Sequence, residues 1–349
     1  MLPTTVPVAR YRFTAIVQQP LQLPDYAGSL LRGQFGAALR NVACMTRQPT
    51  CLGCPLLQTC PYTRIFEAPP PPKGQHALQD FSQIPNPYIV EPPTPGARLL
   101  QEGDPLVFHL VLVGHAIEQL PLIIFALQRA LAKGLTKARV PVDLIQVDHI
   151  TAMGQAHCVW HAERPTLAEH DATLTPLTLI TAINSIASQA CCTGSSGQIT
   201  LKITTPLRLQ HQGKPVGVGQ LTPRALLAAL ARRIALLMEF HARGPTEDFR
   251  WGEAAKAISH LSDTLHDTQA LHWHDWTRYS SRQQQEMTLG GVLGRWTLRA
   301  EDPATLATLA ALWPWLWLGQ WLHVGKNATM GMGAYTLEMP HHECKTTTA

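Results

Sequence analysis

Charged residues are scarce in this sequence, and acids are missing from two long stretches. Only 15% of the 349 residues are charged and 45% are hydrophobic, which is typical of a folded chain long enough for two domains. The net charge of +4 is too small to indicate nucleic acid by itself. However, no acid lies between Tyr26 and Phe66, and Glu286 is the only acid between Trp276 and Arg299. The arginines of these two stretches form basic zones that can bind a polyanion.

The N-terminus lacks the apolar core of a signal peptide. One uncharged stretch, Ala304 to Val324, approaches the length of a membrane span. Its threonines, its internal Pro314 and the Asp302-Pro303 pair before it are typical of a helix in a soluble core instead. We therefore expect a cytoplasmic protein without membrane contact, in which clustered cysteines bind metal rather than form disulfides.

A nucleotide-binding P-loop is also missing. The glycine-rich stretch from His323 to Gly333 follows a long apolar helix and precedes a strand, the reverse of the order in that motif. Its glycines allow the backbone to approach a ligand, and Lys326 adds a positive charge. A helix C-cap would account for Gly325 but leaves Gly331 and Gly333 unexplained. The loop predicts phosphate binding, and a kinase or ATPase is disfavoured.

The hydrophobic periods indicate the same order of elements twice. The first series of strand, helix, two strands, helix and strand covers Ala9–Gln18, Gly28–Cys44, Tyr88–Val90, Leu106–Gly114, Ile117–Ala132 and Val140–His149. The second covers Thr200–Gln210, a helix capped by Thr222-Pro223, Trp273–Ser280, Val292–Arg299, Pro303–Val324 and Ala334–Met339, with a helical insertion at Glu247–Thr268. We predict an α+β protein with two tandem ferredoxin-like (β-α-β-β-α-β, RRM-like) domains at 1–150 and 199–349, joined by a connection at 151–198.

Four cysteines lie in one predicted loop at 44–60, namely Cys44, Cys51, Cys54 and Cys60. The Cys-x2-Cys pair within it is typical of half of a tetrahedral zinc site. We predict structural zinc, while an iron–sulfur cluster and metal-free thiols remain open. Any metal there would steady the loop and would not take part in catalysis.

Several motifs recur in a familiar order along nearly the whole chain, with weaker support between Thr151 and Gly197. They are Gly28–Leu39, Cys51-Leu-Gly-Cys54, Cys60-Pro61-Tyr62, Ile65-Phe66-Glu67, Thr205-Pro206-Leu207-Arg208, Trp276–Gln283 with Gly290-Gly291, and the glycine-rich loop. This series resembles the CRISPR-associated repeat-cleaving endoribonucleases of the RAMP superfamily.

The resemblance implies an enzyme that binds CRISPR repeat RNA and cleaves the precursor into guide crRNAs. It implies metal-independent attack of a 2′-hydroxyl on the adjacent phosphorus, which leaves a 2′,3′-cyclic phosphate. It also implies other CRISPR effector subunits as partners. Two alternatives remain open: a non-catalytic crRNA-binding subunit of a CRISPR effector complex, and a redox or metal protein built on the cysteines.

The sequence departs from the family at the catalytic position. Members often use a histidine near the first helix, and here no histidine precedes His76. Weak or absent cleavage is therefore an open possibility. The catalytic candidates that we select are Tyr26, Arg40 and His323, although a helix-end role for His323 is an equal alternative. The predicted RNA-binding residues are Arg32, Arg278, Arg282, Gly325, Lys326, Asn327, Thr329, Gly331 and Gly333.

Overall fold

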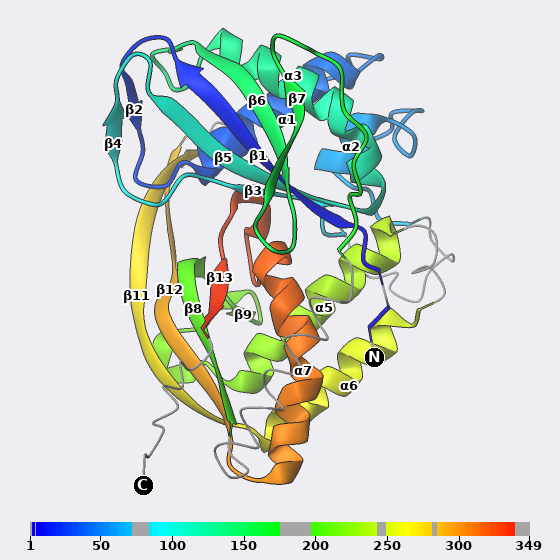
Figure 1. The fold of residues 1–349 in the computed structure, drawn as a ribbon, viewed down its shortest axis with the longest axis vertical. Helices are drawn as coiled ribbons and strands as arrows, with labels where there is room; N and C mark the ends of the chain where they lie inside the picture. The colour runs from blue at the N-terminus through cyan, green and yellow to red at the C-terminus, as the bar shows by residue number, and fades with distance from the viewer. Residues whose placement is uncertain are drawn as a thin grey trace, which may run out of the picture.

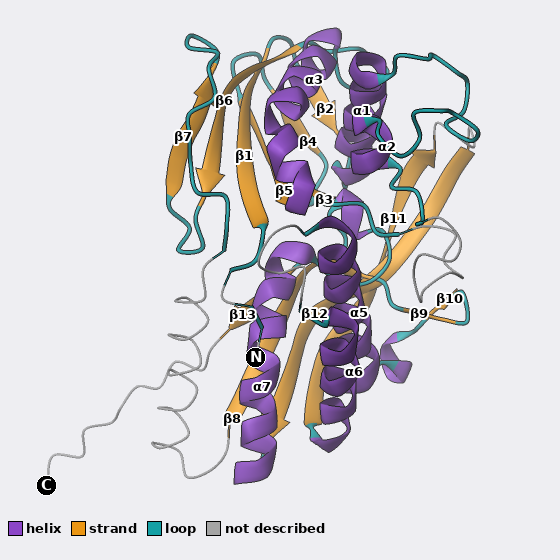
Figure 2. Ribbon diagram, turned by 90° about the vertical axis from the view of Figure 1, so that its right-hand side faces the viewer, coloured by secondary structure: helices purple, strands orange, loops and turns teal. Residues whose placement is uncertain are grey.

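The computed structural model describes residues 2–3, 5–71, 84–174, 197–242, 249–280 and 285–338. Of residues 278–280 and 285–287 it describes only the backbone. Figures 1 and 2 show two parts, which we call the first half (up to residue 174) and the second half (from residue 197). The protein is a mixed fold in which each half contains a sheet with helices against one face (Figure 2).

The first half contains a five-stranded antiparallel sheet in the order β3-β5-β1-β6-β7. Its strands are β1 (Val8–Val17), β3 (Tyr88–Glu91), β5 (Pro105–Val113), β6 (Val142–Ile150) and β7 (Ala156–His161). Helices α1 (Gly28–Ala43) and α3 (Leu120–Lys133) contribute to the same core, and a 3-10 segment (Gly114–Gln119) leads into α3.

Alternation in β1 and helical spacing in α1 explain how this core forms. Tyr11 and Phe13 of β1 lie on the buried face of the strand, two residues apart. Leu31, Phe35 and Leu39 of α1 recur every four residues and are almost fully buried. The two periods bring one apolar face of the sheet against one apolar stripe of the helix.

The second half contains a four-stranded antiparallel sheet in the order β11-β12-β8-β13. Its strands are β8 (Gly197–Leu207), β11 (His266–Ser280), β12 (Gln285–Ala300) and β13 (Tyr335–Glu338). Its helices are α5 (Pro223–His241), α6 (Trp251–Leu261) and α7 (Pro303–Leu322). Both halves therefore run β-α-β-β-α-β along the chain, with β7 and α6 among the additional elements.

Side-chain caps set the start of two helices as their sequences predict. Thr222 accepts a hydrogen bond from the backbone N–H of Ala225 at the start of α5. Asp302 and Thr305 form a reciprocal capping box at the start of α7. The tryptophans of α7 are buried in the core, and none of the described helices combines the length and apolarity that a membrane span requires.

Several elements differ from the sequence-based prediction. Strands β11 and β12 are much longer than expected, so Gly290-Gly291 lies inside β12 rather than before it. The predicted connection at 151–198 contains β7 and the first two residues of β8, and its residues 175–196 lie outside the described residues. The short helix α2 (Pro61–Phe66), the β2–β4 pair (Leu21–Leu23 and Arg98–Leu100) and the β9–β10 pair (Gln210–His211 and Lys214–Pro215) were not predicted. These segments are too short for a hydrophobic period to be recognised in the sequence.

The two halves share part of one core. Val6, Val8, Ile89, Val111 and Val113 of the first half are buried in the same apolar cluster as α5, α7 and β8. Figure 1 shows β11 and β12 extending beside the first half. There Trp276 of β11 packs on Tyr26 with ring centroids 4.5 Å apart. The contact between the halves is where the glycine-rich loop lies.

Candidate nucleic-acid interface

The glycine-rich loop joins the end of α7 to β13 and lies between the two halves. It turns sharply because five residues adopt positive φ, namely His323 (56°), Gly325 (90°), Asn327 (64°), Gly331 (89°) and Gly333 (72°). A short 3-10 turn, η4 (Ala328–Met330), separates the two glycine groups. Such a path needs glycine or asparagine at most of these positions, as the sequence supplies.

Its glycines allow close contact with protein backbone. A Cβ at Gly333 would lie 1.8 Å from the Val324 carbonyl oxygen, and one at Gly331 would lie 2.6 Å from that of Val90. The N–H of Gly331 donates to Ala328 O, and that of Gly333 donates to Pro206 O. Both glycines are buried, so they shape the loop and their N–H groups are not open to a phosphate.

Segment 205–208 at the end of β8 holds the loop from the second half. The Thr205 hydroxyl donates to the Gly331 carbonyl over 2.6 Å and accepts from the Ala334 N–H over 2.8 Å. The Arg208 carbonyl accepts from the Lys326 N–H over 2.9 Å. The Thr-Pro-Leu-Arg motif therefore holds the loop by hydrogen bonds. Its sequence alone did not indicate this role.

The N-terminus of α1 holds the loop from the first half. Tyr26 donates its hydroxyl proton to the Met330 carbonyl over 2.9 Å, and Arg32 Nε donates to Thr329 Oγ1 over 3.2 Å. Helix α1 starts at Gly28 without a side-chain cap and without an acid in its first turn. This end of the helix, with its positive dipole, favours negative charge next to Thr329.

Two cations lie at this junction. The Arg32 guanidinium stacks 4.6 Å above the ring of Phe66, which fixes its position. Lys326 is exposed, and its ammonium has no partner among the described residues. Asn327 and Thr329 are partly exposed beside it. The structure thus places Arg32 in contact with Thr329, in the same loop as Asn327 and Lys326. We call these four predicted RNA-binding residues the junction site (Arg32, Lys326, Asn327 and Thr329).

Tyr26 is not placed as a base or as an orienting group for a 2′-hydroxyl. Its side chain is only 4% exposed, and its hydroxyl is used by Met330. Burial raises the pKa of the Tyr26 phenol far above its ordinary value. The geometry gives Tyr26 the role of joining α1 to the loop.

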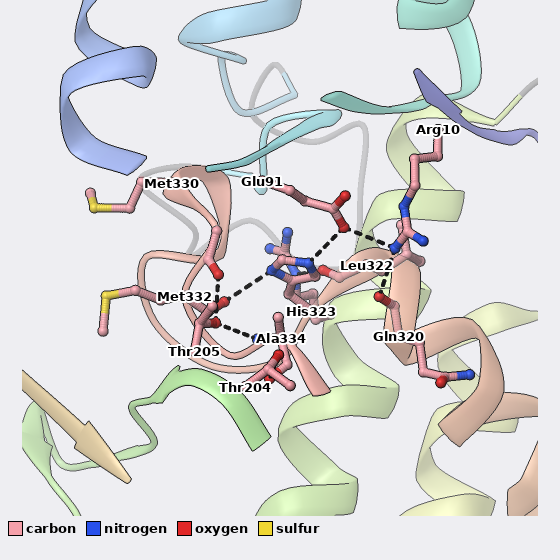
Figure 3. A network of polar contacts seen from close by, with 12 residues as sticks. Arg10, Glu91, Thr204, Thr205, Gln320, Leu322, His323, Met330, Met332 and Ala334 are labelled. Carbon is pink, nitrogen blue, oxygen red and sulfur yellow. Dashed lines mark hydrogen bonds and ion pairs between the residues drawn. The ribbon is translucent and has the colours of Figure 1, made fainter. Parts of the chain in front are cut away.

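His323 lies in a polar network between the halves (Figure 3). Its Nε2 is 3.1 Å from Glu91 Oε1 and its Nδ1 is 3.3 Å from the Met332 carbonyl oxygen. The residue is 1% exposed. A general acid or base needs a ring nitrogen within reach of the RNA, and both nitrogens face protein atoms. The helix-end alternative fits this position better than the catalytic one.

Glu91 is held between His323 and Arg10. Arg10 Nη2 is 2.9 Å from Glu91 Oε1 and also donates to the Gln320 carbonyl over 3.1 Å. Burial alone would raise the pKa of Glu91, but the charges of Arg10 and His323 outweigh it and lower the pKa to about 2. Sequence reasoning missed both Arg10 and Glu91, because their partners are 81 and 232 residues away.

A cleft of about 740 Å³ opens beside this network, between the first half and the edge strand β13. Trp313, Trp317 and Trp321 of α7 line one wall, and Arg10 lies over the ring of Trp321 at 4.5 Å. Arg10 Nε and Trp313 Nε1 are buried N–H groups without a hydrogen-bond partner in the described part of the chain. Because these N–H groups are buried, they lie beneath the surface of the cleft and are not exposed to a ligand.

Arg40 lies away from the junction site. It is eight residues after Arg32, which places it about 12 Å further along the helix. Its guanidinium donates to the carbonyls of Gln48 and Pro49 and lies 5.9 Å from the ring of Tyr62. These contacts give Arg40 a role in holding the cysteine loop against α1, and not in catalysis.

The four cysteines surround one very small cavity but do not form a metal centre in this structure. All four are free thiols, and Thr46 Oγ1 lies 3.5 Å from Cys54 Sγ. Within the described ranges, no three His, Cys, Asp or Glu side chains are arranged to hold a metal ion. The zinc prediction therefore has no structural support.

Three predicted RNA-binding residues remain. Gly325 is partly exposed, and a Cβ there would lie 2.6 Å from the Arg208 carbonyl oxygen, so this glycine allows the loop to approach segment 205–208. The side chains of the other two are not placed. Arg282 lies outside the described residues, and for Arg278 only the backbone in β11 is described. Strand β11, which contains Arg278, nevertheless passes close to the glycine-rich loop, because Trp276 and Leu289 pack with Tyr26, Met330 and Met332.

Two family models match the chain. Residues 201–335 match the model of the CRISPR-associated endoribonuclease Cas6, and residues 5–172 match a model described as an N-terminal domain. Among curated proteins, none matches this sequence.

Solved Cas6 structures have the same fold. A Cas6 product complex superposes with a TM-score of 0.54 at 17% identity, over 95% of this chain and 99% of that chain. A partial complex of Cas6-RT-Cas1 with Cas2 gives 0.53 at 15% identity, over 97% of this chain and 47% of that chain. A Cas6 of Thermus thermophilus gives 0.48 at 14% identity, over 96% of this chain and 100% of that chain. At these identities the first two matches establish the fold.

Proposed function

Because this chain is a Cas6-type protein of the RAMP superfamily, we propose that it binds CRISPR repeat RNA and cleaves precursor transcripts into crRNAs. The observation that carries the proposal is the junction site, where Arg32 of the first half meets the loop of Lys326 and Thr329. It combines two cations, a hydroxyl and an uncapped helix N-terminus whose first turn contains no acid. A backbone phosphate fits this chemistry.

Both halves are interpreted as ferredoxin-like domains. In each half, the first and third strands of the β-α-β-β-α-β series are neighbours at the centre of the sheet, and the second and fourth strands flank them. This order supports the tandem arrangement expected from the sequence. The single-stranded part of the repeat is placed in the cleft beside β13, which is lined by polar side chains such as Thr204, Gln320 and Thr336.

Cleavage at the junction site needs no metal. The 2′-oxygen forms a bond to phosphorus while the bond to the 5′-oxygen breaks, which leaves a 2′,3′-cyclic phosphate and a 5′-hydroxyl. Arg32 and Lys326 stabilise the charge that develops on the phosphoryl oxygens. The Lys326 ammonium donates a proton to the leaving oxygen, and water accepts the proton of the 2′-hydroxyl. Arginine does not act as a base.

A non-catalytic crRNA-binding subunit is the second candidate, and one observation favours it. Tyr26 and His323, the side chains best suited to proton transfer, are 4% and 1% exposed and bonded within the protein. An RNA-binding subunit needs the positive surface but no such group. In both cases we propose a cytoplasmic protein whose partners include other CRISPR effector subunits.

Incubation of the purified protein with end-labelled repeat RNA in EDTA tests the proposal. A single cut that leaves a 2′,3′-cyclic phosphate is the expected result. Tight binding without a cut supports the subunit instead. Absence of binding at modest ionic strength overturns both.

A further inference from the structure

The strongest unexplained feature is the backbone of His323. Its φ of 56° and ψ of 168° lie in a region that is occupied almost only by glycine. A histidine adopts this conformation only where its surroundings hold it there. Strain of this kind is concentrated at functional sites, and His323 is the residue at which α7 ends and the glycine-rich loop begins.

The ring of His323 explains why the strain persists. Nδ1 contacts the Met332 carbonyl oxygen, so the ring joins the start of the loop to its end. Nε2 contacts Glu91, so the same ring joins the loop to β3 of the first half (Figure 3). The Met332 carbonyl oxygen and the Glu91 carboxylate are both hydrogen-bond acceptors, so a ring N–H of His323 can donate to either.

Glu91 Oε1 is the atom that both Arg10 and His323 contact. Arg10 contacts Glu91 from one side and His323 contacts it from the other. Arg10 also donates a hydrogen bond to the Gln320 carbonyl in the last turn of α7. His109, opposite Glu91 in the β3–β5 pair, is the other titratable group that acts on it. The relay Arg10–Glu91–His323 thus spans β1, β3 and the loop.

Lys326 and Thr329 lie between the two loop positions that His323 joins. Their distance from Arg32 therefore depends on the relay as well as on Tyr26. We propose that Glu91 and His323 are positioning residues for RNA cleavage, which hold the glycine-rich loop so that Lys326 and Thr329 face Arg32. This inference rests on the function proposed above. Neither residue touches the RNA.

Single-turnover cleavage at saturating protein tests the relay, with RNA affinity measured in parallel. Glu91→Gln keeps the shape and removes the charge, and His323→Gln removes one of the two contacts. Each is expected to lower the cleavage rate constant about 10-fold to 100-fold, since displacements of about 1 Å have such effects. The dissociation constant is expected to change less than about 3-fold, because affinity is spread over many phosphate contacts.

The double variant separates a shared relay from independent roles. If both residues act through one contact, Glu91→Gln/His323→Gln is no slower than the slower single variant. If the rate losses of the two single variants multiply in the double variant, the relay is overturned. If His323→Gln loses cleavage while Glu91→Gln cleaves at the wild-type rate, the relay is also overturned, and His323 is catalytic instead. The exposed Glu102→Gln in the same half is the control and should cleave at the wild-type rate.

Hydrogen exchange of the amides at 323–333 gives a readout that does not require cleavage. Faster exchange in this stretch, with unchanged exchange in α3, is expected for Glu91→Gln and His323→Gln. If the wild type binds RNA without cutting it, the enzymatic proposal fails. The exchange measurement still tests whether Glu91 and His323 hold the glycine-rich loop in place. Wild-type protection of the loop in both variants overturns it. If His323→Gln does not fold, Glu91→Gln and Arg10→Lys carry the test.

Discussion

Gly28 in α1 lies directly against the carbonyl oxygen of Met330 in the glycine-rich loop, so that a Cβ at Gly28 would be 2.0 Å from that oxygen. The two residues are 302 positions apart in the chain. Together with the Tyr26 hydrogen bond, this contact sets the distance between the positive end of α1 and Lys326. The proposed site is therefore made by the docking of two backbones.

Replacing Gly28 by alanine should disrupt this docking. The new Cβ would meet backbone atoms that cannot rotate away, so we expect a loss of about 1–3 kcal/mol in unfolding free energy, together with slower RNA cleavage. Gly33 lies in the same helix with nothing within 4 Å of an added Cβ, and Gly33→Ala should stabilise the protein by about 0.5–1 kcal/mol. Urea unfolding of both variants measures the difference. Equal effects would show that the contact with Met330 does not constrain α1.

Removing the charge of Lys326 should weaken RNA binding in a salt-dependent way. A single phosphate contact contributes a slope of about 0.7–0.9 to the dependence of log affinity on log salt. Lys326→Met should lower this slope by that amount and weaken the binding of all repeat sequences alike. Lys256→Met, on the exposed surface of α6, is the control and should keep the wild-type slope. An unchanged slope for Lys326→Met would remove Lys326 from the phosphate contacts.

The elements could be predicted where their signals are local. The Leu31, Phe35 and Leu39 spacing defines α1, and the Asp302-Pro303 pair defines the start of α7, so both helices were predicted within about two residues. The β11–β12 ladder is longer than predicted, because the paired glycines within β12 are typical of a turn. Gly290 and Gly291 instead lie where Trp273 and the Leu207 backbone come close.

The site was only partly predictable, because residue type does not reveal burial. Tyr26 and His323 have the chemistry of a base and an acid, but each is bonded to a carbonyl oxygen in the loop. Glu91 and Arg10 carry no motif, since their partners are fixed only when the halves meet. Lys326, Thr329 and Arg32 were predicted, because the glycine-rich loop and the acid-free helix are features of the sequence itself.

The cysteine loop can be tested directly by metal analysis. The spacing of Cys44, Cys51, Cys54 and Cys60 predicts one zinc ion per chain, whereas no three His, Cys, Asp or Glu side chains in the described part of the chain are arranged to hold a metal ion. If the prediction is correct, modification of the thiols should release one equivalent of zinc to a coloured chelator. Four thiols that react freely in a protein without zinc or iron would show that the loop is held by Arg40 and its carbonyl partners alone.

The charge of Glu91 should make stability depend on pH in the acid range. Its pKa is about 2 in the folded protein, below its ordinary value of 4.5. Because the folded pKa is the lower one, the stabilisation is present above pH 4.5 and is lost as the pH falls towards 2. A difference of this size corresponds to about 3 kcal/mol. Glu91→Gln should therefore be less stable than the wild type at pH 7. The difference in unfolding free energy between the two proteins, measured by urea unfolding, should be smaller at pH 3.5. A difference in unfolding free energy that does not change with pH would mean that Glu91 does not act through its charge. The control Glu102→Gln should be as stable as the wild type at both pH values.

His241 should also make the unfolding free energy depend on pH, because its ring is neutral at a second contact between the halves. Its Nε2 donates to the Pro85 carbonyl over 2.6 Å, which leaves Nδ1 to accept from His115 Nε2 over 3.1 Å. Burial lowers the pKa of His241 to about 4, from an ordinary value of 6.5. The unfolded chain then takes up a proton first, so the unfolding free energy should fall by about 3 kcal/mol between pH 6.5 and pH 4.

A His241→Gln variant isolates this contribution. It should lose the His241 share of the pH dependence, although His149, whose pKa burial also lowers to about 4, titrates in the same range in both proteins. The exposed His272→Gln is the matched control and should keep the full wild-type dependence. If His241→Gln and the wild type lose stability in parallel on acidification, then His241 is not the buried neutral group that its contacts with Pro85 and His115 require.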